Sequence, residues 1–332
     1  MNKVTMADVA TYAGVSKSTI SQYVNKRYKF MSESTKIRIE EAIKELNYRP
    51  NSVARSLKQK STFTIGVIVS NILHTFSTKV IRSIEDYCNS LDFHVIVCNA
   101  DDNPEKEERY IQMLRDKQVD GLIVFPTGEN LELYEEMVKT NYPVVFLDRK
   151  IPNLPISSVL LDNEQAVKMA VEHLVKKGYK KIALMTNALH RVYPRQERVR
   201  VFKELTALHQ LPIDEGYIVS RDLGQLKSSL GELLANKPVD AIIAGNDLAL
   251  LEILNYVKEH HIEIPKDLAL ISIDDVSFGN LYNPALTVVA QPAFEMGKKA
   301  AELLLGKIKG NFEEEKEHIY LFQPVLIQRA SC

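Results

Sequence analysis

From about residue 61 to the C-terminus, short apolar runs alternate with longer stretches in which apolar residues recur at helical spacing. Short apolar runs predict strands buried on both faces, and the stretches between them predict amphipathic helices. The alternation occurs in two successive series, so it predicts two parallel sheets with helices on both faces. The expected strands are 63–69, 93–98, 122–125, 144–147, 182–185, 218–219, 241–244 and 268–273, and the expected helices are about 78–91, 104–117, 129–140, 165–177, 195–209, 225–235 and 247–260.

The first 60 residues have a different pattern, which predicts a small all-α head. Thr5 is placed to cap a first helix, with Asp8 completing a capping box. Gly14 falls where this helix ends, because glycine adopts the left-handed conformation without steric cost. Ser16 is placed to cap a second helix, and Ser32 a third that ends at Asn47. The expected inner faces hold Val9, Ala10, Ala13, Val15, Ile20, Tyr23, Val24, Ile39, Ala42, Ile43 and Leu46.

The tight turn between the first two helices has helix-turn-helix spacing. A plain helical hairpin would explain the apolar positions but not the polar start of the second helix. There Lys17, Ser18, Ser21 and Gln22 project away from the packed face, where a recognition helix reaches base edges in the major groove. Cationic side chains around the bundle suit phosphate contacts, although each could equally be a solvated surface charge; they are Lys26, Arg27, Lys29, Lys36 and Arg38.

Charge is distributed unevenly along the 332 residues, whose net charge is −1. Residues 1–60 hold 12 Lys and Arg against 5 Asp and Glu, so the remainder carries −8. A basic head on an acidic body is expected where only the head meets nucleic acid, although small helical domains often have charged faces. Cys88, Cys98 and Cys332 show no metal or redox spacing. No signal peptide or membrane span is apparent, which favours a cytosolic protein.

No enzyme signature emerges from either half of the body. The sequence lacks GxGxxG, a P-loop and GxSxG, so it offers no sign of a dinucleotide enzyme, an NTPase or an α/β-hydrolase. Two alternatives to a DNA-binding regulator stay open: a cytosolic sugar-binding protein without a DNA role, and a sugar-acid enzyme whose catalytic groups are scattered in sequence. We expect no catalytic residues, no metal and no cofactor.

The head resembles that of the LacI/GalR family of bacterial transcription repressors, and the likeness extends over nearly all of the chain. The matching residues are Thr5, Asp8, Val9, Ala10, Ala13, Gly14, Val15, Ser16, Thr19, Ser21 and Asn25, then Asn47, Tyr48, Arg49, Pro50 and Asn51, and then Ala54, Arg55, Ser56, Leu57 and Lys58. The resemblance implies a cytoplasmic, nucleoid-associated repressor of carbohydrate catabolism genes. It would bind a pseudo-palindromic operator in double-stranded DNA as a homodimer, under the control of a small sugar-like effector.

The resemblance also implies the domain organisation. Residues 1–49 would be the DNA-binding domain, 50–61 a hinge helix or linker, and 62–332 the effector-binding and dimerisation domain. That body resembles a periplasmic binding protein, with lobe 1 at about 62–161 and 292–320 and lobe 2 at about 162–291 and 321–332. The three crossovers are expected near 161–163, 291–292 and 320–322, a helix at about 294–309 and a final strand at 325–328. No leucine heptad follows, so a dimer is expected rather than a tetramer.

The hinge is a plain basic linker by composition, and too short to form a stable helix alone in water. In repressors of this family the segment folds against its dimer mate, and a leucine from each copy wedges into the minor groove. Leu57 matches that leucine. The residues to which we assign DNA contacts are Thr5, Ser16, Lys17, Ser18, Ser21, Gln22, Asn25, Ser32, Lys36, Asn51, Ala54, Leu57 and Lys58.

Two residues depart from what is usual in the family. Gln22 stands where the family usually has arginine, and glutamine pairs with adenine rather than guanine. Val201 replaces a glycine that usually follows the arginine represented here by Arg198.

The candidate effector site lies beyond the carboxyl ends of the strands, where open parallel sheets bind ligands. The residues expected there are Asn71, Phe76, Thr127, Asp148 and Arg149 from lobe 1 and Arg191, Arg195, Arg198, Asn246 and Asp274 from lobe 2. Many family members carry a neutral residue in place of Arg149. Arginine matches carboxylate and phosphate, so we expect an anionic effector, a sugar acid such as 2-keto-3-deoxygluconate or a sugar phosphate. The chain also resembles the ketodeoxygluconate-responsive members of the family.

Overall fold

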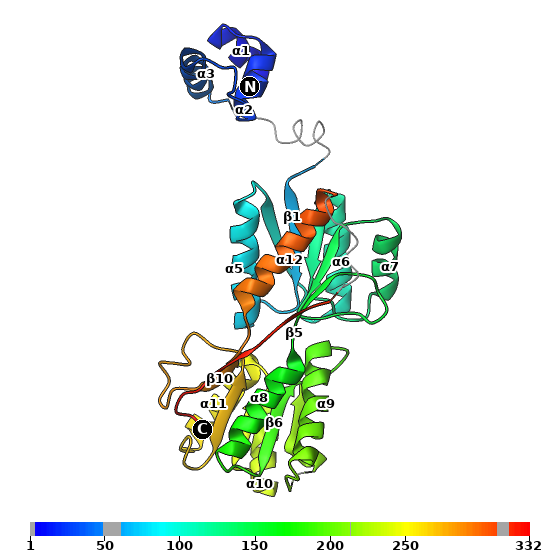
Figure 1. Cartoon of the computed structure of the whole chain (residues 1–332), viewed down its shortest axis with the longest axis vertical. Helices are drawn as coiled ribbons and strands as arrows, with labels where there is room; N and C mark the ends of the chain where they lie inside the picture. Colours follow the sequence, from blue (N-terminus) through cyan, green and yellow to red (C-terminus); the bar gives the residue numbers. More distant parts are fainter. Residues whose placement is uncertain (1–3, 49–60, 213, 311–318) are drawn as a thin grey trace. The chain divides into compact units, whose positions relative to one another are not determined.

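The computed structural model of the protein describes residues 4–48, 61–212, 214–310 and 319–332. The chain divides into two compact units, Met1–Thr62 and Phe63–Cys332. The predicted hinge residues Asn51, Ala54, Leu57 and Lys58 lie outside the described residues. The first unit is a helical head, and the second is a body built on two β-sheets (Figure 1).

The head consists of α1 (Met6–Ala13), α2 (Lys17–Val24) and α3 (Glu33–Glu45). The predicted caps are confirmed: the Asp8 carboxylate accepts the Thr5 backbone N–H at 2.8 Å, and the Ser16 and Ser32 hydroxyls accept backbone N–H groups at 3.1 and 3.2 Å. Gly14 adopts the left-handed conformation, with φ of 61°. The buried core of this unit consists of Val9, Ala10, Ala13, Ile20, Ile39, Ala42 and Tyr48.

The first lobe of the body is built on a six-stranded parallel sheet of order β11-β5-β4-β3-β1-β2. Helices α5 and α12 pack against each other on one face of this sheet (Figure 1). The strands are β1 (Thr64–Val69), β2 (His94–Asn99), β3 (Gly121–Val124), β4 (Val144–Leu147), β5 (Ser158–Leu161) and β11 (Ile319–Phe322), and the helices are α5 (Thr75–Asn89), α6 (Pro104–Asp116), α7 (Leu131–Lys139) and α12 (Ala293–Ile308).

The second lobe repeats this plan around a six-stranded sheet of order β12-β10-β9-β8-β6-β7. Its strands are β6 (Ile182–Asn187), β7 (Ile218–Arg221), β8 (Ala241–Ala244), β9 (Ala269–Ile273), β10 (Thr287–Ala290) and β12 (Val325–Ile327). Its helices are α8 (Asn163–Lys176), α9 (Tyr193–Leu208), α10 (Leu223–Asn236) and α11 (Asp247–Glu259), with the short 3₁₀ helix η1 (Glu215–Tyr217).

The structure corrects the predicted sheets in three respects. The second sheet is mixed, because β10 runs toward a crossover between lobes while β12 runs away from one, which makes the pair antiparallel. Strand β2 is not buried on both faces, because it forms the edge of its sheet. Strands β5, β10 and β11 were not predicted, and each lies beside a crossover between the lobes.

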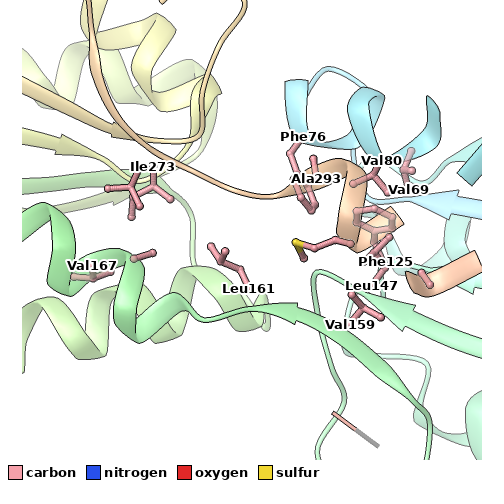
Figure 2. Close-up of a cluster of buried hydrophobic side chains, with 14 of the residues drawn as sticks. Val69, Phe76, Val80, Phe125, Leu147, Val159, Leu161, Val167, Ile273 and Ala293 are labelled. Carbon is pink, nitrogen blue, oxygen red and sulfur yellow. The ribbon is translucent and has the colours of Figure 1, made fainter. Parts of the chain in front are cut away.

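Three segments connect the lobes: the residues between β5 and α8, those between β10 and α12, and Gln323–Pro324 between β11 and β12. The third lies later than the expected 320–322, because β11 pairs with β5 through Phe322. Buried apolar side chains line both lobes near these segments. Figure 2 shows Phe76, Phe125, Leu147 and Ala293 grouped in the first lobe, and Val167 and Ile273 in the second, with Leu161 between the two groups.

Candidate functional site

The exposed start of α2 is the candidate DNA-contacting surface of the head. Lys17, Ser18 and Gln22 are exposed, whereas Ser21 and Asn25 are half-buried. The Asn25 amide donates to the Ser21 carbonyl at 2.6 Å, so it already has a partner within the helix. Of the other predicted contact residues, Thr5, Ser16 and Ser32 are exposed at helix N-termini, and half-buried Lys36 pairs with Glu33 at 2.9 Å. A free polar edge suited to base contacts is thus presented by α2.

A cavity lies where the carboxyl ends of the two body sheets face each other. The space between atoms measures about 420 Å³, part of it open to solvent. The cavity is lined from both lobes by Ser70, His74, Phe76, Ser77, Asp148, Arg149, Val192, Pro194, Arg195, Arg198, Asn246, Asp274 and Gln291. Seven of the ten predicted effector residues are among them: Phe76, Asp148, Arg149, Arg195, Arg198, Asn246 and Asp274.

Arg149, which follows β4, is the most informative side chain in the cavity. It is only 3% exposed, and its Nη2 atom lies 2.7 Å from Asp102 Oδ1. Its Nε atom is 3.5 Å from Asp148 Oδ2, too poorly placed for a hydrogen bond. Among the described residues, neither Nε nor Nη1 has a hydrogen-bond acceptor. Buried guanidinium N–H groups without acceptors are costly, so the site is suited to a ligand that supplies acceptors.

The second lobe contributes Arg195 and Arg198, which lie on the same face of α9. Arg195 donates to the Ala188 carbonyl at 2.9 Å and to Asp102 Oδ2 at 2.8 Å. Arg198 donates to Asn163 Oδ1 at 2.7 Å and to the Gly245 carbonyl at 2.5 Å. These bonds hold both guanidinium groups at the cavity wall.

Polar groups that follow β8 and β9, and one from the second crossover, also line the cavity. The Asn246 side chain caps α11 by accepting the Ala249 N–H at 2.9 Å. Asp274 accepts a hydrogen bond from Gln291 Nε2 at 2.5 Å, and Gln291 Oε1 is buried without a donor among the described residues. Burial, together with the nearby charge of Asp247, raises the pKa of Asp274 to about 7. Asp274 and Gln291 can therefore accept hydrogen bonds from ligand hydroxyl groups.

Several contacts bridge the two lobes at the rim of the cavity. The Asp247 carboxylate accepts the Thr75 N–H at 2.5 Å and lies 2.5 Å from His74 Nδ1. Burial raises the pKa of Asp247, but the His74 and Thr75 contacts outweigh it and hold that pKa below its usual value. Lys79 Nζ donates to the Asp275 carbonyl at 2.9 Å. The lobes are therefore held together around the cavity by polar contacts.

Three predicted effector residues do not line the cavity. Asn71 accepts the Leu73 N–H at 2.9 Å within its own turn. Thr127 is held away by a bond from its N–H to Glu107 Oε2 at 2.7 Å. Arg191 is exposed and pairs with Glu129 at 3.0 Å.

Six lining residues were missed by the sequence analysis: Ser70, His74, Ser77, Val192, Pro194 and Gln291. Ser70 directly follows β1, so the rule that found Asn71 could have found it. Gln291 was recognised only as a crossover residue. For the others the sequence offers no comparable signal.

Among the described residues there is no group of His, Cys, Asp and Glu side chains that could hold a metal ion. In the same part of the chain, none of the helices combines the length and apolar character required to cross a lipid bilayer.

Two family models match parts of the chain, and several known proteins are similar to it over nearly its whole length. Residues 5–51 match the model described as bacterial regulatory proteins, lacI family, and residues 171–332 match a periplasmic binding protein-like domain. The probable HTH-type transcriptional regulator EndR of Paenibacillus polymyxa is 49% identical, over 98% of each chain. The regulator KdgR of Bacillus subtilis (strain 168) is 35% identical over 92% of each chain, and the repressor PurR of Aliivibrio fischeri is 33% identical over 98% of each.

Solved structures resemble the chain over nearly its full length. The lac repressor dimer bound to operator and the anti-inducer ONPF has a TM-score of 0.84 and 27% identity, with 99% of each chain covered. The complex of the transcriptional regulator CelR with cellobiose has a TM-score of 0.73 and 25% identity, covering 99% of this chain and 100% of that one. The similarity thus includes both the helical head and the two-lobed body.

Proposed function

Since the chain belongs to the lacI family of bacterial regulatory proteins, and is thus a DNA-binding transcriptional regulator, we propose that its body senses a small anionic sugar, a sugar acid or a sugar phosphate. Binding of this effector between the lobes would change the affinity of the head for an operator. Such coupling is reciprocal, so operator DNA must change effector affinity by the same factor.

The observation that carries the proposal is that, within the part of the chain that the structure describes, the buried Arg149 side chain has unused hydrogen-bond donors at the cavity. This guanidinium is buried, lines the cavity, and has two N–H-bearing nitrogens without acceptors among the described residues. A ligand carboxylate or phosphate supplies such acceptors in the geometry that a guanidinium prefers. In the same cavity, Asp274 and Gln291 Oε1 can accept bonds from hydroxyl groups, which suits the remainder of a sugar.

Titration calorimetry with matched pairs of sugars tests the proposal. D-galacturonate and D-galactose differ only in a carboxylate against a hydroxymethyl group, and D-gluconate and 2-keto-3-deoxygluconate extend the set of acids. We expect at least one anionic sugar to bind with a Kd at least about 100-fold below that of the neutral sugars, as two charge-assisted hydrogen bonds permit. Tight binding of neutral sugars alone would refute the proposal. A mobility-shift assay with the bound sugar then measures its effect on operator affinity.

On the DNA side, we propose that α2 is the recognition helix of a homodimer that reads a pseudo-palindromic operator. The similarity to the lac repressor dimer on its operator supports this arrangement. The contacts would come from Lys17, Ser18 and Gln22 on the exposed edge of α2, with Thr5, Ser16, Ser21, Asn25, Ser32 and Lys36 around it. The hinge residues Asn51, Ala54, Leu57 and Lys58 would complete the interface.

Gln22 should determine one operator base. Its side chain is exposed on α2, and glutamine forms two hydrogen bonds with adenine, whereas arginine does so with guanine. We expect Gln22→Arg to shift the preference at one position of each half-site from adenine to guanine, by about 1–3 kcal/mol. A base-by-base operator scan of both proteins measures this. An unchanged preference at every position would refute the assignment.

A further inference from the structure

Asp102, which follows β2, is shared by two arginines from different lobes. Its Oδ1 atom lies 2.7 Å from Arg149 Nη2 in the first lobe, and its Oδ2 atom accepts Arg195 Nη2 of the second lobe at 2.8 Å. Burial alone would raise the pKa of Asp102, but the charges of Arg149 and Arg195 outweigh it and keep that pKa below its usual value. Asp102 is therefore a carboxylate that forms an ion pair with Arg149 and a hydrogen bond with Arg195 beside the cavity, without lining the cavity itself.

The charges around the cavity are closely balanced. Three guanidinium groups, those of Arg149, Arg195 and Arg198, face the carboxylates of Asp102, Asp148 and Asp274. His74 and Asp247 form a separate pair at the rim. The site thus combines unpartnered donor groups on Arg149 with almost no surplus of positive charge.

We propose that Asp102 is a positioning residue that limits the charge of the effector, so that the site accepts a sugar monocarboxylate and discriminates against a phosphate monoester. The inference rests on the proposed function and decides between the two kinds of anion that it allows. Asp102 pairs with Arg149 of the first lobe and Arg195 of the second, so it holds both guanidinium groups beside the same cavity. Its negative charge neutralises one of their two positive charges.

The physical reason is the cost of uncompensated buried charge. A phosphate monoester carries about −1.5 to −2 charges at pH 7, whereas a carboxylate carries one. In a buried site whose own charges nearly cancel, the second negative charge has no partner and loses its hydration. When Asp274 holds a proton, the three guanidinium groups face only two carboxylates, and the remaining positive charge balances the single charge of a ligand carboxylate. The raised pKa of Asp274 allows this protonation near neutral pH.

The test compares two classes of ligand on the full-length protein. Calorimetry is carried out with the monocarboxylates D-gluconate, D-galacturonate and 2-keto-3-deoxygluconate, and with the phosphate monoesters D-glucose 6-phosphate and D-galactose 1-phosphate. For the unmodified protein, we expect the best monocarboxylate to bind at least about tenfold more tightly than the best phosphate, which corresponds to one unbalanced charge contributing about 1.4 kcal/mol.

Variants of Asp102 then assign this preference. Asp102→Asn should reduce the ratio of the Kd of the phosphate to the Kd of the monocarboxylate at least about tenfold. The reason is that the substitution frees one guanidinium charge to pair with a dianion. Asp102→Glu, which keeps the charge, should retain most of the preference. Asp101→Asn is the matched control, because the same charge is removed from an exposed neighbour paired with Lys106, and the ratio should not change.

Each failure has its own signature. Tighter binding of phosphates by the unmodified protein would overturn this inference and leave the anionic-effector proposal intact, and that measurement requires no variant to fold. A ratio that is equal in Asp102→Asn and Asp101→Asn would overturn the role of Asp102. Binding of neutral sugars alone would refute the proposed function itself.

Discussion

Replacing Arg149 by alanine should weaken the binding of a sugar acid by about 100-fold or more, while the protein stays folded. The substitution removes a buried guanidinium whose Nε and Nη1 atoms have no acceptor among the described residues. A hydrogen bond to a charged group contributes about 1.5–3 kcal/mol, and two such bonds give the expected factor. Asp102 keeps its bond to Arg195, so the substitution does not leave that carboxylate unpaired.

Arg191→Ala provides the matched control for this prediction. Both variants lose an arginine from the vicinity of the cavity, but Arg191 is exposed and pairs with Glu129 at 3.0 Å. An exposed ion pair contributes about 1 kcal/mol or less, so Arg191→Ala should change the Kd of the sugar acid less than about fivefold. Calorimetry on both variants measures the difference. Equal effects would contradict the assignment of Arg149 as the anion-binding group.

Arg149→Lys separates charge from geometry. Lysine keeps the positive charge but lacks the planar fork that binds both oxygens of a carboxylate. We expect an intermediate loss for Arg149→Lys, and a restoration of full affinity would indicate that only the charge matters. Binding of neutral sugars should change little in all three variants, because the acceptors that suit hydroxyl groups, Asp274 and Gln291 Oε1, are left unchanged.

The position of the cavity could be predicted because it follows from topology. In both sheets the polar residues that follow neighbouring parallel strands meet at one edge. This rule places Asp148, Arg149, Asn246 and Asp274 at the same cavity without any knowledge of side-chain contacts. The same reasoning failed for Arg191, which precedes the N-cap of α9. Arg195 and Arg198 lie three residues apart inside that helix and therefore share a face.

Other features depend on contacts that leave no trace in one sequence. Glu107 lies on α6 among charged residues typical of a solvated face, yet it is buried. It accepts bonds from the Thr127 N–H at 2.7 Å, Asn130 at 2.9 Å and the Tyr134 hydroxyl at 2.9 Å, and burial raises its pKa despite these bonds. This network fixes the loop after β3 and holds Thr127 away from the cavity.

Contacts between the lobes could not be predicted for a similar reason. His74 and Asp247 are 173 residues apart, and they meet only because the two lobes approach each other. Asn246 and Asp247 are both residue types that can cap a helix, but only Asn246 caps α11, whereas Asp247 contacts the first lobe. Helix capping is a local interaction, so both residues are recognisable as capping candidates in the sequence. Which of the two caps α11 depends on the contact between Asp247 and the first lobe, which the sequence does not show.

The largest expected effect on stability concerns Asp274. This carboxyl group is 5% exposed, and burial together with the charge of Asp247 raises its pKa from 3.8 to about 7. A raised pKa means that the folded protein holds this proton more tightly than the unfolded chain does. The corresponding stabilisation is complete below about pH 4, and it is lost as the pH rises through the folded pKa near 7.

We therefore expect Asp274→Asn to gain stability relative to the unmodified protein as the pH rises. Asparagine resembles the neutral carboxyl group in shape and can still accept the bond from Gln291. The difference in the free energy of unfolding should be nearly constant below pH 4 and then increase by about 4 kcal/mol in favour of the variant up to pH 7–8. Urea denaturation of both proteins without effector, at pH values from 4 to 8, measures this difference.

Comparing the two proteins at each pH removes the contributions of all other titrating groups that they share. Asp275→Asn is the control, because this neighbouring carboxylate is half-buried and pairs with Arg329 at 3.2 Å. Removing it should destabilise the protein or leave it unchanged at neutral pH, the opposite direction from Asp274→Asn. If the stability difference for Asp274→Asn stayed flat between pH 4 and 8, Asp274 would be ionised throughout. Protonation of Asp274 could then not balance the charge of a bound monocarboxylate, which would contradict that part of the argument.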